Sequence, residues 1–386
     1  MRVLAVADAD SYLKWSVATL DRLPSSWDRR QAIVSSPLAP SPAQIAAAAG
    51  GEVPVVSVAK LHASLLRDPP DVLLLACTGP TVQVLAGLPA VRRQARRRPV
   101  LVTGLPGINF PASGRAVDFR RGCDLFVVHS RREHRDLDAL VATRAPGLAV
   151  ALGRLPFLTG GSEAAASPPW HGVVFAAQAK VPARRADREA VLLALSQVSP
   201  SGSAVVKVRA ISGERQTHHE ALDYADLWHD LVARGAVRPD SVRFVSGSMD
   251  DALRTARGLV TVSSTAALEA MDQGLPVVVL SDFGVDEGMI NLVFEGSGCL
   301  GDLADVRAGR AFDPDSGWLV DNYFHPPGED DLVAQLESLA AQRRAGALPR
   351  RPGPPATLTT VRAAARLIVP SRISGLTRRR RAQSVG

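Results

Sequence analysis

The sequence of 386 residues is poor in cysteine and in aromatic residues, and it contains no long apolar run. Its cysteines, Cys77, Cys123 and Cys299, lie far apart without paired spacing, which excludes a disulfide framework and a zinc site built on cysteine pairs. No apolar stretch approaches the roughly 20 residues that a membrane-spanning helix needs. The start, MRVLAVADAD, turns acidic after a short apolar run, so we expect no signal peptide and a cytoplasmic protein.

Motifs for metal ions and for nucleoside triphosphates are missing too. The eight histidines form no HxxxH pair with an accompanying acid. The pattern Asp8-Ala9-Asp10 lies at the extreme N-terminus, where it does not resemble a metal motif. The absence of GxxxxGK[ST] argues against a P-loop NTPase. We therefore expect neither a metal ion nor a cofactor.

What the chain does contain suits two ordinary domains. Hydrophobic residues make up 46% and charged residues 22% of the sequence, a balance typical of soluble globular proteins. The formal net charge of +7 is uneven, because arginines form two clusters: Arg92, Arg93, Arg96, Arg97 and Arg98, and Arg378–Arg381. Such clusters either attract phosphate groups or form solvated surface. Aromatic residues are only 5% of the chain and are not interleaved with the clusters, so we expect no nucleic-acid partner.

Near-continuous Val and Leu runs, each followed by turn or helix-start residues, recur in the first 150 residues. They lie at Val3–Ala7, 71–76, 99–103 and 124–128. Such runs are typical of parallel strands that are covered on both faces. Amphipathic patterns between them, as at Tyr12–Arg22, predict crossover helices. We therefore predict a doubly wound α/β domain over residues 1–157.

A second α/β domain follows a segment without periodicity. This segment, PFLTGGSEAAASPPWH, is rich in Gly, Ser, Ala and Pro, and we take residues 158–171 as the linker. Strands and helices alternate again from Val173 to Leu280. We assign residues 172–348 to this second domain and residues 349–386 to a basic C-terminal tail.

Three hydroxyl residues, Ser263, Ser264 and Thr265, lie where the predicted strand Gly258–Val262 meets a short helix. In an open α/β sheet, ligands bind outside the carboxyl ends of the strands, and unpaired amides at such a junction favour an anion such as a diphosphate. The alternative is plain helix capping by Ser or Thr. Glu269, one turn after Thr265, either accepts hydrogen bonds from a ribose or is an exposed helix acid.

The stretch TVSSTAALEAMDQGLPVVVL resembles bacterial capsule and surface-polysaccharide glycosyltransferases of the GT-B type. AVVKVR and SGSMDDALRTARGLV extend the resemblance, which covers roughly residues 173–282. Nucleotide-sugar epimerases of the same fold carry a similar motif. The resemblance implies two Rossmann-like doubly wound domains that face a cleft, with a nucleotide-sugar donor on the second domain and the acceptor on the first.

The resemblance also implies roles for individual residues of the second domain. Ser246, Gly247 and Ser248 would meet the base, Ser263–Thr265 the diphosphate and Glu269 the ribose. Lys207 and Arg209 lie two apart on one strand and would neutralise charge on the leaving nucleotide. Many relatives have His-Pro near this strand end, whereas here Ala-Ile-Ser-Gly follows Arg209. Gln178 and Lys180 follow the first strand of this domain and either bind the donor or are ordinary loop residues.

The first domain should supply the catalytic base. Asp8 and Asp10 leave the carboxyl end of the first strand, where a carboxylate either takes a proton from an acceptor hydroxyl or caps the helix. His129, which also follows a strand, is the other candidate base. Gly104 and Gly107 either permit close approach by an acceptor or form a plain turn.

These observations predict a metal-independent glycosyltransferase that moves a sugar from a nucleotide-sugar donor to a surface or capsular glycan, free or lipid-linked. The alternative enzyme is a nucleotide-sugar 2-epimerase of the UDP-GlcNAc type, and the alternative from another class is a nucleic-acid-binding protein. The tail, ARLIVPSRISGLTRRRR, either rests on the anionic inner face of the membrane or is a solubilising extension.

Overall fold

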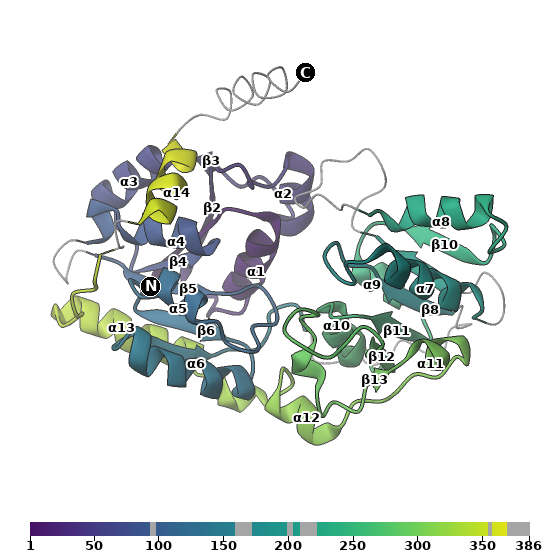
Figure 1. Ribbon diagram of the computed structural model, residues 1–386. Coiled ribbons are helices and arrows are strands. Elements are labelled where there is room, and N and C mark those ends of the chain that lie inside the picture. Colours follow the sequence, from purple (N-terminus) through teal and green to yellow (C-terminus); the bar gives the residue numbers. More distant parts are fainter. Residues whose placement is uncertain (93–97, 159–171, 199–203, 209–221, 354–356, 369–386) are drawn as a thin grey trace, which may run out of the picture. The chain divides into compact units, whose positions relative to one another are not determined.

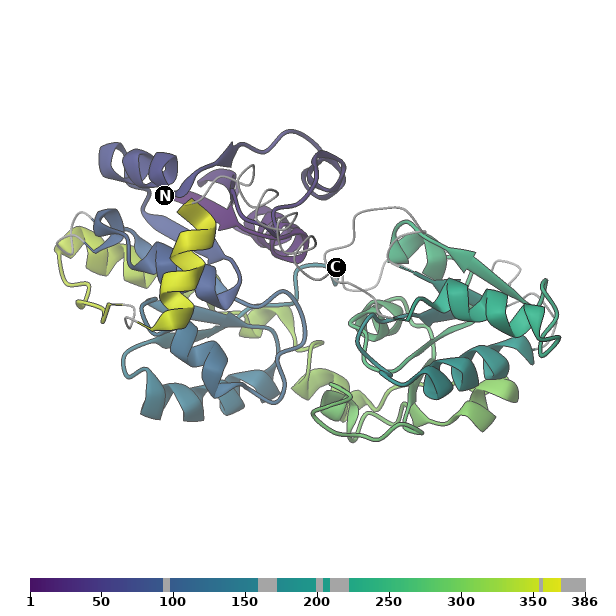
Figure 2. The ribbon, with the colours of Figure 1, turned by 45° about the horizontal axis from the view of Figure 1, so that its top comes forward.

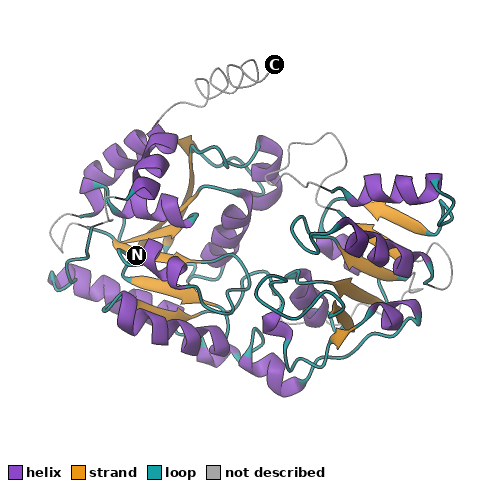
Figure 3. Ribbon diagram, viewed as in Figure 1, coloured by secondary structure: helices purple, strands orange, loops and turns teal. Residues whose placement is uncertain are grey.

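The computed structural model describes residues 1–92, 98–158, 172–198, 204–208, 222–353 and 357–368 (Figure 1). The chain divides into two compact units. The first unit comprises Met1–Pro156 together with Pro326–Gly386, and the second comprises Phe157–His325. In each unit a layer of strands lies between helices (Figure 3).

The described part of the first unit holds a seven-stranded sheet in which every pair of neighbours is parallel. Its order is β3 (Val55–Val56), β2 (Asp28–Val34), β1 (Arg2–Ala7), β4 (Val72–Ala76), β5 (Val100–Gly104), β6 (Leu125–Val128) and β7 (Ala149–Leu152). Every residue of β4, β5 and β6 is buried, which explains their unbroken apolar sequence, since parallel sheets are covered on both faces.

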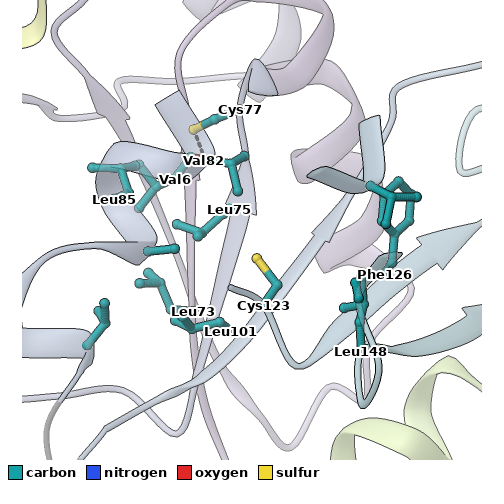
Figure 4. Close-up of a cluster of buried hydrophobic side chains, with 14 of the residues drawn as sticks. Val6, Leu73, Leu75, Cys77, Val82, Leu85, Leu101, Cys123, Phe126 and Leu148 are labelled. Atoms are coloured by element: carbon teal, nitrogen blue, oxygen red, sulfur yellow. Dashed lines mark hydrogen bonds between the residues drawn. The ribbon is translucent and has the colours of Figure 1, made fainter. Parts of the chain in front are cut away.

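Helices cover both faces of this first sheet. One face packs against α1 (Asp10–Asp21), α2 (Pro42–Ala49) and α13 (Leu332–Ala345). The other packs against α3 (Val58–Arg67), α4 (Gly79–Ala86), the short η1 (Pro89–Val91), α5 (Gly114–Arg120), α6 (Arg131–Arg144) and α14 (Leu358–Ile368). Figure 4 shows part of this second core, in which the Cys77 thiol donates to the Val6 carbonyl at 3.2 Å.

The described part of the second unit holds a six-stranded parallel sheet. Its order is β10 (Val242–Val245), β9 (Ala204–Lys207), β8 (Val173–Ala176), β11 (Gly258–Thr261), β12 (Val277–Leu280) and β13 (Leu300–Gly301). One face packs against α7 (Arg185–Ser196), α8 (Tyr224–Ala233) and α11 (Leu303–Arg307). The remaining elements are α9 (Met249–Leu253), α10 (Ala266–Asp272), η2 (Leu292–Phe294) and α12 (Ser316–Asp321).

The fold class predicted from the sequence, two Rossmann-like doubly wound α/β domains as in GT-B proteins, is confirmed by the two parallel sheets and their crossover helices. Within the described residues, no helix is both long enough and apolar enough to cross a bilayer.

The predicted end of the second domain at residue 348 is wrong, because the chain returns to the first unit at Pro326. After η3 (Pro327–Glu329), helix α13 buries Leu336 and Leu339 in the same core as Trp15. The tail predicted from residue 349 is also partly folded, since Leu367 of α14 joins the opposite core of the first unit. The arginines at 378–381 lie outside the described residues.

Candidate functional site

Both sheets have a switch point, where the strand order reverses and neighbouring crossovers leave in opposite directions. In the first sheet the switch point lies between β1 and β4, and in the second it lies between β8 and β11. Loops that follow the carboxyl ends of such strands form the usual ligand site of open α/β sheets. Among the candidates, Asp8 and Asp10 follow β1, Gln178 and Lys180 follow β8, and Ser263–Thr265 follow β11. Other candidates follow or end neighbouring strands: Gly104, Gly107, His129, Lys207 and Ser246–Ser248.

Gln178 and Ser263 bridge the switch point of the second sheet. The Gln178 Oε1 atom accepts from the Ser263 backbone amide at 2.8 Å, and Gln178 Nε2 donates to the Ser263 hydroxyl at 2.9 Å. Ser263 is only 6% exposed. These two residues therefore hold the ends of β8 and β11 together, and the Ser263 hydroxyl is engaged within the protein.

Ser264 and Thr265 are both half-buried, but only Ser264 behaves as a cap. The Ser264 hydroxyl accepts from the Ala266 amide at 3.2 Å, while the Ser264 amide donates to the Thr261 hydroxyl at 3.1 Å. Thr265 has no side-chain cap bond. Within the part of the chain that the structure describes, the Thr265 amide and hydroxyl have no hydrogen-bond partner. Thr265 thus offers two donors at the switch point.

Glu269 is half-buried and lies one turn into α10. Its backbone amide donates to the Thr265 carbonyl at 3.4 Å, which places it on the same side of the helix as Thr265. Lys207 ends β9 beside Ala176 of β8, is 7% exposed, and donates from Nζ to the Val208 carbonyl at 2.8 Å. Lys180 is exposed, and Arg209 lies outside the described residues.

The loop after β10 contains the three residues predicted to meet a base. Ser246 is exposed, and Gly247 has φ +98°, a conformation that favours glycine. Ser248 caps α9, because its hydroxyl accepts from the Asp251 amide at 3.0 Å and donates to the Asp251 carboxylate at 2.6 Å. Beside this loop lies a cavity of about 240 Å³, lined by Val205, Arg243, Ser246 and Asp251 among others.

Asp8 and Thr78 bridge the switch point of the first sheet in the same manner. The Asp8 carboxylate accepts from the Thr78 amide at 2.9 Å and from the Thr78 hydroxyl at 2.6 Å. Asp8 is 1% exposed, so its carboxylate is committed to Thr78 and is not open to an acceptor hydroxyl. The interpretation of Asp8 as a base therefore has no geometric support here.

Asp10 is placed differently, at the start of α1. Its Oδ2 atom pairs with Lys14 Nζ at 2.8 Å, while Oδ1 is buried without a hydrogen-bond partner among the described residues. The capping interpretation does not hold for Asp10, because the N-cap of α1 is Ala9. One carboxylate oxygen of Asp10 is thus uncommitted.

His129 is 2% exposed and both of its ring nitrogens are occupied. Trp15 Nε1 donates to His129 Nε2 at 2.8 Å, and His129 Nδ1 lies 2.8 Å from the Gly153 carbonyl. An indole N–H only donates and a carbonyl only accepts, so the ring is neutral with its proton on Nδ1. His129 therefore serves the packing of β6, β7 and α1, and this geometry does not support its predicted role as a base.

Trp15 also explains Gly104. A Cβ at Gly104 would lie 2.5 Å from Trp15 Cζ2, so glycine leaves room for the indole and not for an acceptor. Gly107 is buried with φ +140° in the loop that follows β5. Two residues later the Asn109 amide donates to Glu133 at 2.7 Å, which fixes this loop against α6.

Three residues near these sites, Thr78, Trp15 and Tyr12, were not predicted from the sequence. Tyr12 is buried in α1, and its hydroxyl accepts from Arg120 Nη2 at 3.1 Å. Burial raises the pKa of Tyr12 to about 12. Thr78 could have been recognised in the sequence, because it follows β4 by two residues just as Ser263 follows β11. Trp15 lies 114 residues from His129, and no local pattern indicated that they are in contact.

No group of three or more His, Cys, Asp or Glu side chains that could hold a metal ion occurs among the described residues. In the second unit, Asp282 follows β12 and accepts from the Leu303 amide at 3.0 Å. Burial raises the pKa of this carboxyl.

Comparison with known proteins gives a family and a fold. A family model described as "Putative glycosyltransferase (DUF6716)" matches residues 3–339, which is most of the chain. No curated protein matches the sequence significantly.

Solved structures resemble the chain over most of its length. S. aureus MnaA, in its co-structure with UDP, aligns with a TM-score of 0.52 at 10% identity and covers 91% of this chain and 99% of its own. UDP-GlcNAc 2-epimerase from Methanocaldococcus jannaschii aligns with a TM-score of 0.51 at 9% identity and covers 88% of this chain and 99% of its own. At such low identity the likeness shows the fold alone.

Proposed function

The chain belongs to the DUF6716 family, and we propose that it is a metal-independent glycosyltransferase that moves a sugar from a nucleotide-sugar donor to a surface or capsular glycan. The observation that carries this proposal is the switch point of the second sheet. There Gln178 and Ser263 hold two strand ends together, while the amide and hydroxyl of Thr265 have no hydrogen-bond partner among the residues that the structure describes.

The charge at the two switch points favours the second unit as the donor site. A carboxylate, Asp8, occupies the switch point of the first sheet, whereas a neutral amide, Gln178, occupies that of the second. A diphosphate carries negative charge, so Asp8 would repel it and Gln178 would not. Lys207, buried at the end of the adjacent strand β9, adds a positive charge to the second site.

The donor would lie across three loops of the second unit. We assign the diphosphate to Ser263–Thr265 and the ribose to Glu269. Lys207, Lys180 and Arg209 would neutralise the leaving nucleotide without a metal ion. Ser246–Ser248 would receive the base.

Asp10 is the proposed base in the first unit. Its side chain is 20% exposed and its Oδ1 atom has no hydrogen-bond partner among the described residues, whereas Asp8 and His129 are buried and their acceptor atoms bond Thr78 and Trp15. A positioned carboxylate accelerates proton transfer from an acceptor hydroxyl by about 10² to 10⁴. Gly107 belongs to the loop after β5, for which an acceptor-side role remains proposed. The three cysteines are free and buried, which fits a reducing cytoplasm.

Nucleotide binding tests the donor site. Thermal unfolding of the full chain is measured with UDP, GDP, ADP, CDP and dTDP and with their sugar conjugates, and one nucleotide class is expected to raise the Tm. Thr265→Val removes one donor and should weaken that nucleotide about fivefold, while Glu269→Ala should weaken it about 10- to 100-fold.

Thr143→Val is the matched control, because Thr143 is exposed on α6 in the first unit. It should leave nucleotide stabilisation unchanged. If no nucleotide raises the Tm, or if Thr265→Val and Glu269→Ala respond like wild type, the donor site lies elsewhere.

A nucleotide-sugar 2-epimerase is the second candidate, because the fold is shared with the epimerase from M. jannaschii. Incubation with UDP-GlcNAc alone separates the two functions, since an epimerase needs no acceptor. NMR spectra that show the 2-epimer under these conditions would replace the transferase proposal by the epimerase one.

A further inference from the structure

We propose that one face of the first unit docks onto an anionic lipid surface. This basic face consists of α3, η1, α4 and α14, which pack on the same core and lie side by side (Figure 1, Figure 2). Its exposed basic residues are Lys60, Arg67, Arg92, Arg362 and Arg366. The inference goes beyond sugar transfer and does not depend on it.

The fold brings together two arginine-rich segments that are more than 250 residues apart in the sequence. A Cβ at Gly353 would lie 2.4 Å from Arg92 Nη1, so the Arg92 guanidinium rests on the segment that leads to α14. Arg98 Nη2 donates to the Pro349 carbonyl at 2.8 Å. The Thr360 hydroxyl of α14 then donates to Gln83 of α4 at 3.0 Å. The segment that follows η1 and the segment that leads to α14 therefore belong to one face.

The basic face carries no acid within its helices, and Asp68, the exposed C-cap of α3, pairs with Arg2. The sequences of α3, η1, α4 and α14 contain neither Asp nor Glu. None of the five exposed basic residues pairs with a carboxylate among the described residues. Exposed arginines elsewhere do pair, as Arg144 does with Asp118 and Arg254 with Asp250. The face thus presents uncompensated positive charge.

The net positive charge of the sequence is concentrated in the segment that contains α14. Residues 349–386 contain nine of the 45 basic residues and none of the 38 acidic ones, so the other 348 residues carry a net charge of −2. Arg351 of this segment is used internally, since its Nε donates to Asp124 at 2.8 Å. A polybasic segment that follows a folded helix is attracted to anionic lipid headgroups.

Exposed apolar residues on the same helices favour a membrane over nucleic acid. Val361 is 60% exposed and Leu66 is 36% exposed. On α14, Val361 and Ala365 lie one turn apart, as do Arg362 and Arg366, and all four are exposed. A helix with apolar and basic residues on its outer side is typical of interfacial binding. Residues 349–386 contain no aromatic residue on which a base could stack.

Co-sedimentation of the full chain with vesicles tests this proposal without any nucleotide. Wild type should bind vesicles of phosphatidylcholine with phosphatidylglycerol and not vesicles of phosphatidylcholine alone. The variant Arg362→Glu/Arg366→Glu should lower the partition coefficient by at least about tenfold, because each basic residue near an anionic surface contributes about fivefold. Val361→Ser should weaken the binding that persists at high salt, where charge is screened.

Arg257→Glu/Arg307→Glu is the control of equal charge, since both arginines are exposed on the second unit. It should retain most of the vesicle binding. Wild-type binding should also fall steeply with salt, a measurement that needs no variant. Equal binding to neutral vesicles, salt-independent binding, equal loss in the control, or binding to an oligonucleotide but not to vesicles would each overturn the proposal.

Discussion

The Asp8 carboxylate accepts two hydrogen bonds from Thr78, one from the amide at 2.9 Å and one from the hydroxyl at 2.6 Å. Gln178 and Ser263 make the corresponding pair of bonds in the second unit. In both units, such a pair of bonds joins the end of the first strand to the end of the fourth. The side chain that makes these bonds is a carboxylate in the first unit and a neutral amide in the second. This difference leads to our first prediction.

Asp8→Ala should lower the free energy of unfolding by about 1–3 kcal/mol. An alanine accepts no hydrogen bond, so the Thr78 amide and hydroxyl both lose their Asp8 partner. Asp8→Asn should cost less, because an asparagine can accept from the Thr78 amide and donate to its hydroxyl, as Gln178 does with Ser263. Chemical denaturation measures the change. If stability stays at the wild-type value while transfer is lost, Asp8 is the base after all.

Asp10→Asn should leave the free energy of unfolding nearly unchanged but lower the rate of sugar transfer. The Asp10–Lys14 pair is largely exposed on the lysine side, and such pairs contribute about 0–1 kcal/mol to stability. Once donor and acceptor are known, kcat should fall by about 10² to 10⁴, because asparagine cannot take a proton. A variant that keeps its kcat would remove Asp10 from the reaction.

Gly104→Ala should destabilise the first unit by about 1–3 kcal/mol. The new methyl group would lie 2.5 Å from Trp15 Cζ2 and 3.1 Å from the Val127 carbonyl, and a well-packed core does not yield easily. Gly51→Ala is the matched control, because no atom lies within 4 Å of a Cβ there. Equal stabilities of the two variants, measured by thermal or denaturant unfolding, would contradict this prediction.

Asp124→Asn should lower the free energy of unfolding by about 3–5 kcal/mol. Asp124 is fully buried and accepts from Arg98 at 2.7 and 2.9 Å and from Arg351 at 2.8 Å. Removing the carboxylate charge leaves buried guanidinium groups unpaired. Asp118→Asn breaks a pair that is 44% exposed on both sides and should cost less than about 1 kcal/mol.

The three thiols should resist modification in the native protein. Burial raises the pKa of Cys123 to about 12 and that of Cys299 to about 11, and it raises the pKa of Cys77 well above the ordinary value of a thiol. The thiolate is the reactive form, so a disulfide reagent at pH 8 should label none before unfolding and three afterwards. The contribution of the buried thiols to the free energy of unfolding is fully present below pH 9. It is lost as the pH rises through their pKa values in the folded protein. Labelling of any thiol in the native protein at pH 8 would show that its burial is incomplete.

The sequence predicted the fold class because buried parallel strands leave unbroken Val and Leu runs, as in β4 and β12. It missed β2, whose first residues, Asp-Arg-Arg, are exposed and polar. The domain boundary at 348 was wrong because the contacts of Leu336 and Leu339 with the Trp15 core join distant parts of the chain. No local pattern records such a contact.

The position of the hydroxyl cluster was predictable because a strand, three hydroxyls and a helix are adjacent in the sequence. The separate hydrogen bonds of the three hydroxyl residues were not predictable. Ser263 bonds Gln178, which follows another strand, and within the described part of the chain Thr265 has no hydrogen-bond partner for its amide or hydroxyl. In the same way, the sequence could not show that Trp15, which is far away in the chain, donates a hydrogen bond to His129 Nε2.

The return of the chain at Pro326 has a consequence for biosynthesis. A ribosome makes the strands of the first unit early, yet it delivers α13 and α14, which cover both faces of that sheet, only after the entire second unit has emerged. Domains usually fold in the order of their synthesis. Here the later unit is the first to be complete, and the sheet of the earlier one keeps uncovered apolar surface until α13 and α14 have been made.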